Sequence, residues 1–257
     1  VGLAHLLWQP TDALDVMYSY DRTEHDEAPI PMFVTFVNTA VRNPAPNLIA
    51  PFLADQGDRP SSGSFDNDYI GETTVEGHAL HVDFEICEGL AFSSISGYRE
   101  MENAGSGDND GSPYPLLWTE DYQENDVLTQ EFRLIGEAFD ARLDYVLGAF
   151  YLDENGDVDQ STYLDEAVAR SLPALRNVPY RSQTVTDFQT ETWALYTQAT
   201  YALTDRWDVT AGIRYTEEER DMSKTDFLSI SGRLARTTLF PDANKEFDNV
   251  SPMGSVS

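Results

Sequence analysis

Hydrophobic and polar residues alternate through residues 192–219, on both sides of a short break at residues 204–206. Before the break, mostly apolar or aromatic side chains occupy every second position from Trp193 to Leu203. After the break the same spacing resumes from Trp207 to Tyr215, and the intervening positions are small or polar. A period of two on both sides of a tight turn predicts a β-hairpin with one apolar face.

The arms of this hairpin have the length expected of membrane-spanning strands. A tilted strand needs about 9–11 residues to cross a bilayer, and each apolar run is of that order. Aromatic residues stand near both ends of each run, namely Trp193, Tyr201, Trp207 and Tyr215. Such positions are typical of the aromatic girdles of outer-membrane barrels. We therefore predict a transmembrane hairpin whose opposite, polar face lines a lumen.

Three other segments show the same alternation around a short turn. We predict hairpins at residues 4–20, 78–98 and 127–152, with turns near Thr11, Glu88 and Phe139, and a ninth strand from Asn249 onward. The intervening residues 24–74, 100–126, 153–184 and 221–247 lose the alternation and are predicted to be long loops. Within them, residues 32–37 are expected to form a short strand or a plugging segment, and residues 164–171 a short helix.

Short turns at one end and long loops at the other are typical of outer-membrane barrels. The predicted fold is therefore all-β, an antiparallel up-and-down transmembrane β-barrel, present here as a partial barrel of about nine strands with long loops. The alternative is a soluble all-β module, such as a carbohydrate-binding sandwich with exposed Tyr and Trp platforms. A sandwich would show turn signals every 8–12 residues without this asymmetry.

Composition narrows the possible functions. The chain of 257 residues has 45 acidic and 16 basic residues and a formal charge of −29. That sign excludes nucleic acid as a partner, because phosphate contacts need basic residues. An aromatic content of 12% is too high for a disordered acidic chain. The mean hydropathy is −0.41, and no run of about 18 apolar residues predicts a transmembrane helix.

Several segments resemble the barrel of TonB-dependent outer-membrane receptors. They are residues 128–134 (LTQEFRL), 143–151 (LDYVLGAFY), 194–218 with AGIRYT near its end, and 247–252 (FDNVSP). The resemblance is best over residues 126–252 and weaker, but in step, over residues 3–100. It implies a 22-stranded barrel filled by a plug, which takes up scarce ligands such as ferric siderophores with energy delivered by TonB.

The resemblance also sets the expected context of the chain. Residues 1–257 are expected to be one partial barrel domain, a fragment without the plug domain and terminal strands. The expected location is the outer membrane of a Gram-negative bacterium. The expected partners are the TonB complex through the missing plug, a ligand such as a ferric siderophore, and outer-membrane lipid. A passive porin-like channel has the same fold and is the other alternative.

Glu131, Arg133 and Arg214 are the candidate ligand-binding residues. Glu131 and Arg133 are two positions apart on one predicted strand, so their side chains share a face. If the apolar face contacts lipid, these two and Arg214 point into the lumen. They form either an ion-paired wall, a plug contact or a ligand site.

The sequence predicts no catalytic site, cofactor or metal site, and we expect no enzyme activity. No Ser/His/Asp arrangement, nucleotide-binding loop or carboxylate pair occurs at a recognisable spacing. Residues 153–159 superficially resemble a calcium loop, but Val158 replaces its glycine and Leu164 replaces its last glutamate. His78 and His81 point to opposite faces of a strand and are not expected to share a metal. The single cysteine, Cys87, permits no internal disulfide.

Overall fold

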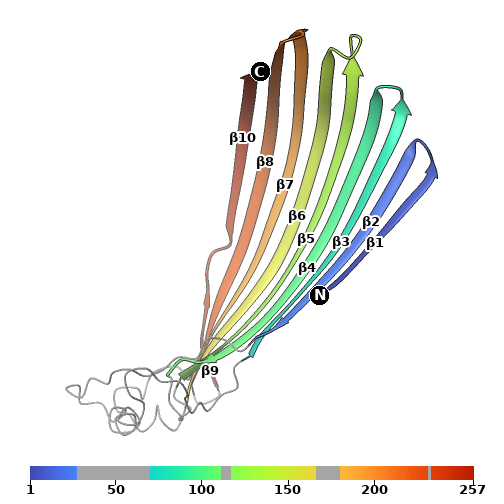
Figure 1. Cartoon of the computed structure of the whole chain (residues 1–257). Helices are drawn as coiled ribbons and strands as arrows, with labels where there is room; N and C mark the ends of the chain where they lie inside the picture. The colour runs from blue at the N-terminus through green and yellow to red at the C-terminus, as the bar shows by residue number, and fades with distance from the viewer. Residues whose placement is uncertain (28–69, 111–116, 166–179, 231–232) are drawn as a thin grey trace, which may run out of the picture.

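The computed structural model describes residues 1–27, 70–110, 117–165, 180–230 and 233–257, which form a single antiparallel sheet (Figure 1). The sheet has ten strands, and each pairs with a neighbour in the sequence or the next but one. Their bounds are β1 Gly2–Thr11, β2 Leu14–Asp26, β3 Ile70–Cys87, β4 Leu90–Asp108, β5 Leu117–Ala138, β6 Leu143–Leu164, β7 Arg181–Thr204, β8 Trp207–Ile230, β9 Arg233–Leu239 and β10 Ala243–Val256.

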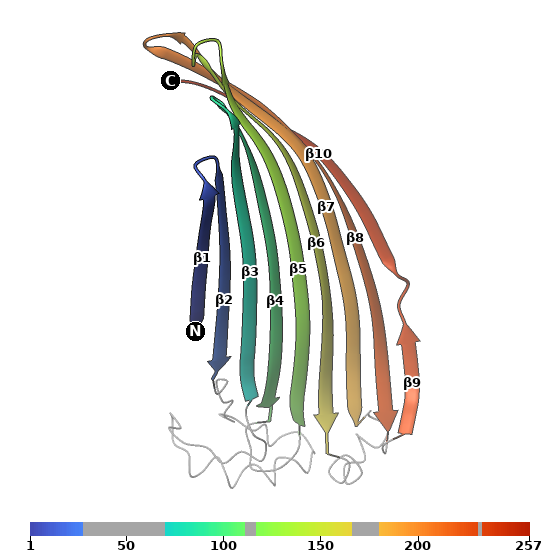
Figure 2. The ribbon, with the colours of Figure 1, turned by 90° about the vertical axis from the view of Figure 1, so that its right-hand side faces the viewer.

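The strands follow one another across the sheet without a crossover, in the order β1 to β8 and then β10, and β9 pairs with β8 beyond β10. The sheet is curved along and across its strands and is not closed on itself (Figure 2). Two packed sheets, as in a soluble sandwich, are not formed by the described residues. In the same part of the chain, no helix is long and apolar enough to span a membrane.

The four predicted tight turns are confirmed, and all lie at the same end of the sheet (Figure 1). They fall at residues 12–13, 88–89, 139–142 and 205–206. The third turn has Phe139, Asp140 and Ala141 in the left-handed region, with φ near 57°, 56° and 59°. Left-handed backbone is costly for residues with a Cβ, so this turn is locally strained.

The predicted loops are wrong at their boundaries, because the strands continue well into them. Residues 100–108 and 117–126 pair with each other as parts of β4 and β5, and residues 153–164 and 181–184 belong to β6 and β7. These segments lack the sequence alternation because small or polar residues occupy both faces of the strands there. The expected short strand at 32–37 lies outside the described residues, as does most of the expected helix at 164–171, whose first residue ends β6.

The expected loop at 221–247 is also wrong, and the described residues form ten strands where about nine were expected. Residues 221–230 complete β8, and β9 folds back onto them with Ile230 opposite Arg233. Leu239 pairs with Thr225, and Ala243 pairs with Met222. Residues 240–242, which follow β9, are therefore opposite only two residues of β8, 223 and 224. This β-bulge separates β9 from β10, which makes ten strands.

The strand register gives the sheet one continuous apolar face, as predicted. Directly opposed residues share a face, so each face can be followed from β1 to β10. The apolar face carries, strand by strand, Leu6 and Trp8; Val16 and Tyr18; Leu80, Val82 and Phe84; Phe92 and Tyr98; Leu128, Phe132 and Leu134; Tyr145, Leu147 and Tyr151; Trp193, Leu195 and Tyr201; Trp207, Val209, Ile213 and Tyr215; and Val250.

Burial shows which face is concave, because side chains crowd together on the inside of a curved sheet. Ser93, Thr192 and Ala194 are buried, and all three lie on the polar face. On the apolar face, Leu195 is 56% exposed and Ile213 is 50% exposed. The polar face is therefore the inner face, and the apolar face is the outer one.

Candidate functional site

The register places the three candidate ligand-binding residues on the inner face. A transverse row at one depth runs from Ser93 on β4 through Arg133 and Gly148 to Tyr196 and Arg214 on β8. Glu131 belongs to the neighbouring row and is opposite Phe150. The sheet therefore brings together one carboxylate and two guanidinium groups from β5 and β8.

Glu131 is the centre of a hydrogen-bonded cluster in which both of its carboxylate oxygens are used. Arg133 Nη2 donates to Glu131 Oε2 at 2.6 Å, and the Tyr196 hydroxyl donates to Glu131 Oε1 at 2.5 Å. Ionised donors and acceptors make the stronger hydrogen bonds in proteins. Arg133 and Glu131 thus neutralise each other, and Tyr196 ties β7 to β5 across the intervening β6.

Gly148 is what lets Tyr196 reach across β6. It lies between Arg133 and Tyr196 in the register, and a Cβ at this position would be 2.0 Å from Tyr196 Cζ. The ring therefore lies flat on the backbone of β6, in space that any side chain would fill. Tyr196 was not among the residues predicted from the sequence, although an aromatic residue between Ala194 and Gln198 on the polar face was a usable signal.

Arg214 is held differently from Arg133. Its guanidinium carbon is 5.6 Å from the centroid of the Phe150 ring and 5.8 Å from that of Tyr196. Its Nε donates to the Thr216 hydroxyl at 3.1 Å. These contacts fix the plane of the guanidinium, because cations within about 6 Å of a ring centroid are attracted to the ring.

A serine, a histidine and an aspartate also meet on the inner face, beside this cluster. His81 Nε2 is 3.0 Å from the Ser93 hydroxyl and 3.2 Å from Asp83 Oδ1. A catalytic triad needs the serine and the carboxylate on different ring nitrogens, so that one side of the imidazole is oriented and the other accepts a proton. Here both contacts involve Nε2, so the arrangement is not that of a triad.

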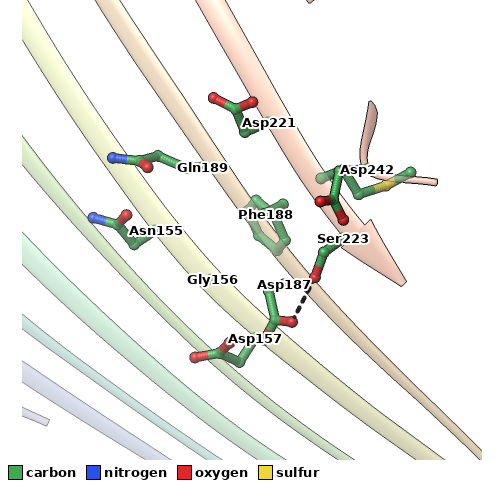
Figure 3. A pocket seen from close by; sticks show the side chains of 10 residues that line it. Asn155, Gly156, Asp157, Asp187, Phe188, Gln189, Asp221, Ser223 and Asp242 are labelled. Atoms are coloured by element: carbon green, nitrogen blue, oxygen red, sulfur yellow. Dashed lines mark hydrogen bonds between the residues drawn. The ribbon is translucent and has the colours of Figure 1, made fainter. Parts of the chain in front are cut away.

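A separate pocket of about 470 Å³ lies over β6, β7 and β8 near the bulge before β10 (Figure 3). Asp157 is opposite Asp187, which accepts a hydrogen bond of 2.8 Å from the Ser223 hydroxyl (Figure 3). The hydrogen bond with Asp187 is the main cause that raises the pKa of Asp157, and the Ser223 hydroxyl chiefly lowers the pKa of Asp187. These side chains share the face of Trp193, so the pocket is outside the lumen.

The residues that superficially resemble a calcium loop are part of a regular strand. Residues 153–159 pair on both sides, with β5 and with β7. A continuous strand points alternate side chains to opposite faces and cannot wrap its oxygens around one ion. In the described residues, no group of three or more His, Cys, Asp or Glu side chains is placed to hold a metal ion.

Comparison with known proteins assigns a family to this architecture. Residues 8–257 match the family model described as TonB dependent receptor-like, beta-barrel. No curated protein matches the sequence. The family match covers almost the whole chain and includes all of the strands from β2 onward.

Solved structures share the fold at low sequence identity. The ferric yersiniabactin uptake receptor FyuA from Yersinia pestis is 15% identical with a TM-score of 0.69, over 99% of this chain and 34% of that one. The open form of the ferric-catecholate import receptor Fiu from E. coli K12 is 12% identical with a TM-score of 0.62, over 99% and 43%. The siderophore receptor PiuA from Acinetobacter baumannii is 10% identical with a TM-score of 0.58, over 99% and 39%. The chain thus spans under half the length of these structures.

Proposed function

Since the chain belongs to the TonB-dependent receptor β-barrel family, we propose that it forms part of the wall of a receptor that imports a scarce ligand, such as a ferric siderophore, across the outer membrane of a Gram-negative bacterium. The observation that carries the proposal is the continuous apolar outer face, which lies opposite a polar inner face with its own charged cluster. FyuA is a ferric yersiniabactin uptake receptor, Fiu a ferric-catecholate import receptor and PiuA a siderophore receptor, which supports a ferric siderophore as the cargo.

The height of the apolar band supports a membrane location. The aromatic residues that bound it are eight residues apart on β7 and β8, from Trp193 to Tyr201 and from Trp207 to Tyr215. A strand rises about 3.3 Å per residue, and a tilt near 40° leaves about 2.5 Å of this along the membrane normal. Eight steps then cover about 20 Å, close to the roughly 25 Å band of outer-membrane barrels.

In this proposal the chain acts together with parts that it does not contain. Among the described residues, nothing pairs with the outer edges of β1 and β10, and an open edge is not tolerated in hydrocarbon. Further strands of the same receptor would pair with these edges, and a plug inside the barrel would contact the TonB complex. Glu131, Arg133 and Arg214 would face that interior, where they contact the plug or the ligand. The protein would be a transport receptor and not an enzyme.

Iron uptake by whole cells tests the proposal. Cells that carry the complete gene would be given a radiolabelled ferric siderophore, with and without functional TonB, and cells without the gene would give the background. We expect uptake above background only when TonB is functional. Gene-dependent uptake that persists unchanged without TonB would instead establish the passive porin-like channel.

A further inference from the structure

We propose that Arg214 binds a carboxylate group inside the lumen, through the two terminal nitrogens of its guanidinium. This inference rests on the proposed function for the position of Arg214 on the lumen wall. It separates the three candidate residues, because Arg133 is hydrogen-bonded to Glu131, whereas no carboxylate among the described residues is hydrogen-bonded to Arg214.

The terminal nitrogens of Arg214 form no hydrogen bond with the described residues. Only Nε forms a hydrogen bond, to Thr216, and no ion pair to Arg214 is found in the described part of the chain. The pair of Nη groups is the part of arginine that matches the two oxygens of a carboxylate. The cluster therefore has an excess of one positive charge: Glu131 is ion-paired with Arg133, and Arg214 attracts the same carboxylate only at longer range, without a hydrogen bond.

The surroundings of Arg214 preorganise this donor pair. The Phe150 and Tyr196 rings flank the guanidinium, and Thr216 restricts rotation about its Nε end. Ala194 lies between Phe150 and Thr216 in the register and is only 1% exposed, so its small side chain leaves room for these neighbours above it. A side chain already fixed in its binding orientation loses little conformational entropy when a ligand arrives.

Arg220 provides a matched comparison within the same strand. It also lies on the inner face of β8, and its guanidinium carbon is 5.7 Å from the centroid of the Phe247 ring. Its Nε, however, donates to Glu218 Oε1 at 2.6 Å, so its carboxylate is supplied by the strand itself. Arg214 lies on the same strand and the same face and also contacts aromatic rings. Its Nε, however, donates to the hydroxyl of Thr216 and not to a glutamate.

Two sources can supply the carboxylate that Arg214 binds. One is a carboxylate on the imported ligand, and the other is an Asp or Glu side chain of a segment of the receptor that fills the lumen. Both present the same two oxygens to the same pair of donors. The experiment below distinguishes them.

The first measurement is binding of acetate and citrate, as carboxylate probes, to the purified full receptor in detergent micelles, followed by calorimetry at constant ionic strength. For a carboxylate on the ligand, we expect saturable binding that Arg214→Met weakens about tenfold or more and Arg220→Met leaves unchanged. Arg214→Lys keeps the charge without the paired donors, so it should recover only part of the affinity.

The second measurement applies where neither probe binds, and it detects a carboxylate of the receptor itself. Glu131, Arg133 and Tyr196 are the other titratable groups around Arg214, so the comparison is made in a Glu131→Gln background. Loss of Arg214 would leave an inner carboxylate unpaired, and the urea midpoint of Arg214→Met should then fall further below its background as pH rises from about 4 to 7. Loss of ring stacking alone is independent of pH.

The outcomes are distinct from one another and from the outcome of the uptake assay. Binding that depends on Arg214 assigns the carboxylate to the ligand, and a pH-dependent loss of stability assigns it to the receptor. Absence of probe binding together with a pH-independent difference would overturn the proposal. Neither measurement requires uptake, so a receptor that imports without TonB could still have this carboxylate site.

Discussion

Placing an arginine on each face of β6 tests the assignment of lipid and lumen faces most directly. Leu147 and Val146 are adjacent in the sequence and point to opposite faces of one strand. Leu147 is opposite Leu134 and Thr197 on the outer face, and Val146 is opposite Ile135 and Gln198 on the inner face. The two variants therefore share their strand, depth and new side chain and differ only in the face that receives the charge.

The expected cost at Leu147 follows from its depth. Leu147 is one residue from the midpoint between the outer-face Tyr145 and Tyr151. One residue corresponds to about 2.5 Å along the membrane normal at the tilt of outer-membrane strands, so the side chain lies near the middle of the bilayer. An arginine at the bilayer midplane of a barrel costs about 2–4 kcal/mol, and Leu147 is 48% exposed to that environment.

Val146→Arg and Val209→Arg complete the comparison. The Val146 variant places its charge on the wet inner wall and should cost less than about 1 kcal/mol, mostly through lost packing. Val209 is on the outer face but only two residues from Trp207, near the membrane interface, where an arginine costs about 0–1 kcal/mol. A cost that depends on both face and depth is the signature of a bilayer.

The assay is reversible folding of the complete receptor into lipid vesicles, titrated with urea and followed by tryptophan fluorescence. We expect the free energy of unfolding to fall by about 2–4 kcal/mol for Leu147→Arg and by clearly less for the other two variants. Equal losses for Leu147→Arg and Val146→Arg would refute the face assignment. An equal loss at Val209 would refute the assigned depth.

Two smaller predictions use the same unfolding assay, and a third uses binding of the carboxylate probes. Asp157→Asn should stabilise the receptor by about 0.2–1 kcal/mol at pH 7, because it removes a like-charged pair with Asp187. The raised pKa of Asp157 means that wild-type stability falls as pH rises through that pKa, so the gain should disappear near pH 3. Gly148→Ala should cost about 1–3 kcal/mol, because its Cβ displaces Tyr196 from Glu131, and the Tyr196→Phe change should cost less in that background than in the wild type. If Arg214→Met weakens acetate or citrate binding, Ala194→Leu should weaken it too, because the larger side chain fills the space beneath the neighbours of Ala194. Unchanged binding would show that Arg214 does not lie above Ala194.

The fold could be predicted where one face of the sheet is apolar and the other polar. Such a difference between the faces imposes a period of two, which is why the hairpin around Asp205 was evident from the sequence. Toward the far strand ends both faces carry small or polar residues, and the period disappears. Residues 100–108 therefore read as a loop, although their backbone hydrogen bonds continue those of β4 without a break.

The candidate site could be predicted only in part, for a related reason. Spacing along one strand is enough to place Glu131 and Arg133 side by side. Tyr196 is 65 residues away from Glu131 and two strands across the sheet, so its contact depends on two register choices and on the gap at Gly148. The face to which Phe150 points could not be predicted, because its strand is apolar on both faces. Only its pairing with Glu131 and Ala194 places it on the inner face.

The net charge of −29 describes the outside of the protein far better than its lumen. Beyond the apolar band, the outer face carries Glu24, Glu76, Glu100, Glu102, Glu124, Asp126, Asp153, Asp157, Asp187, Glu191, Glu217, Glu219, Asp221, Glu246 and Asp248, together with the bases Arg22 and Arg181. The inner face at the same heights carries Asp21, Asp121, Glu154, Glu218 and Asp226 together with Arg99, Arg220, Lys224 and Lys245.

The division of charge between the two faces decides what a ligand in the lumen would experience. On the described inner face, acids and bases are nearly balanced, and several are paired, as Asp21 is with Arg99 and Glu218 with Arg220. Screening reduces the influence of the outer carboxylates, since the Debye length is about 8 Å at physiological salt. An unpaired Arg214 is then a strong local feature, and an anionic group can be favoured inside a protein whose overall charge would repel it.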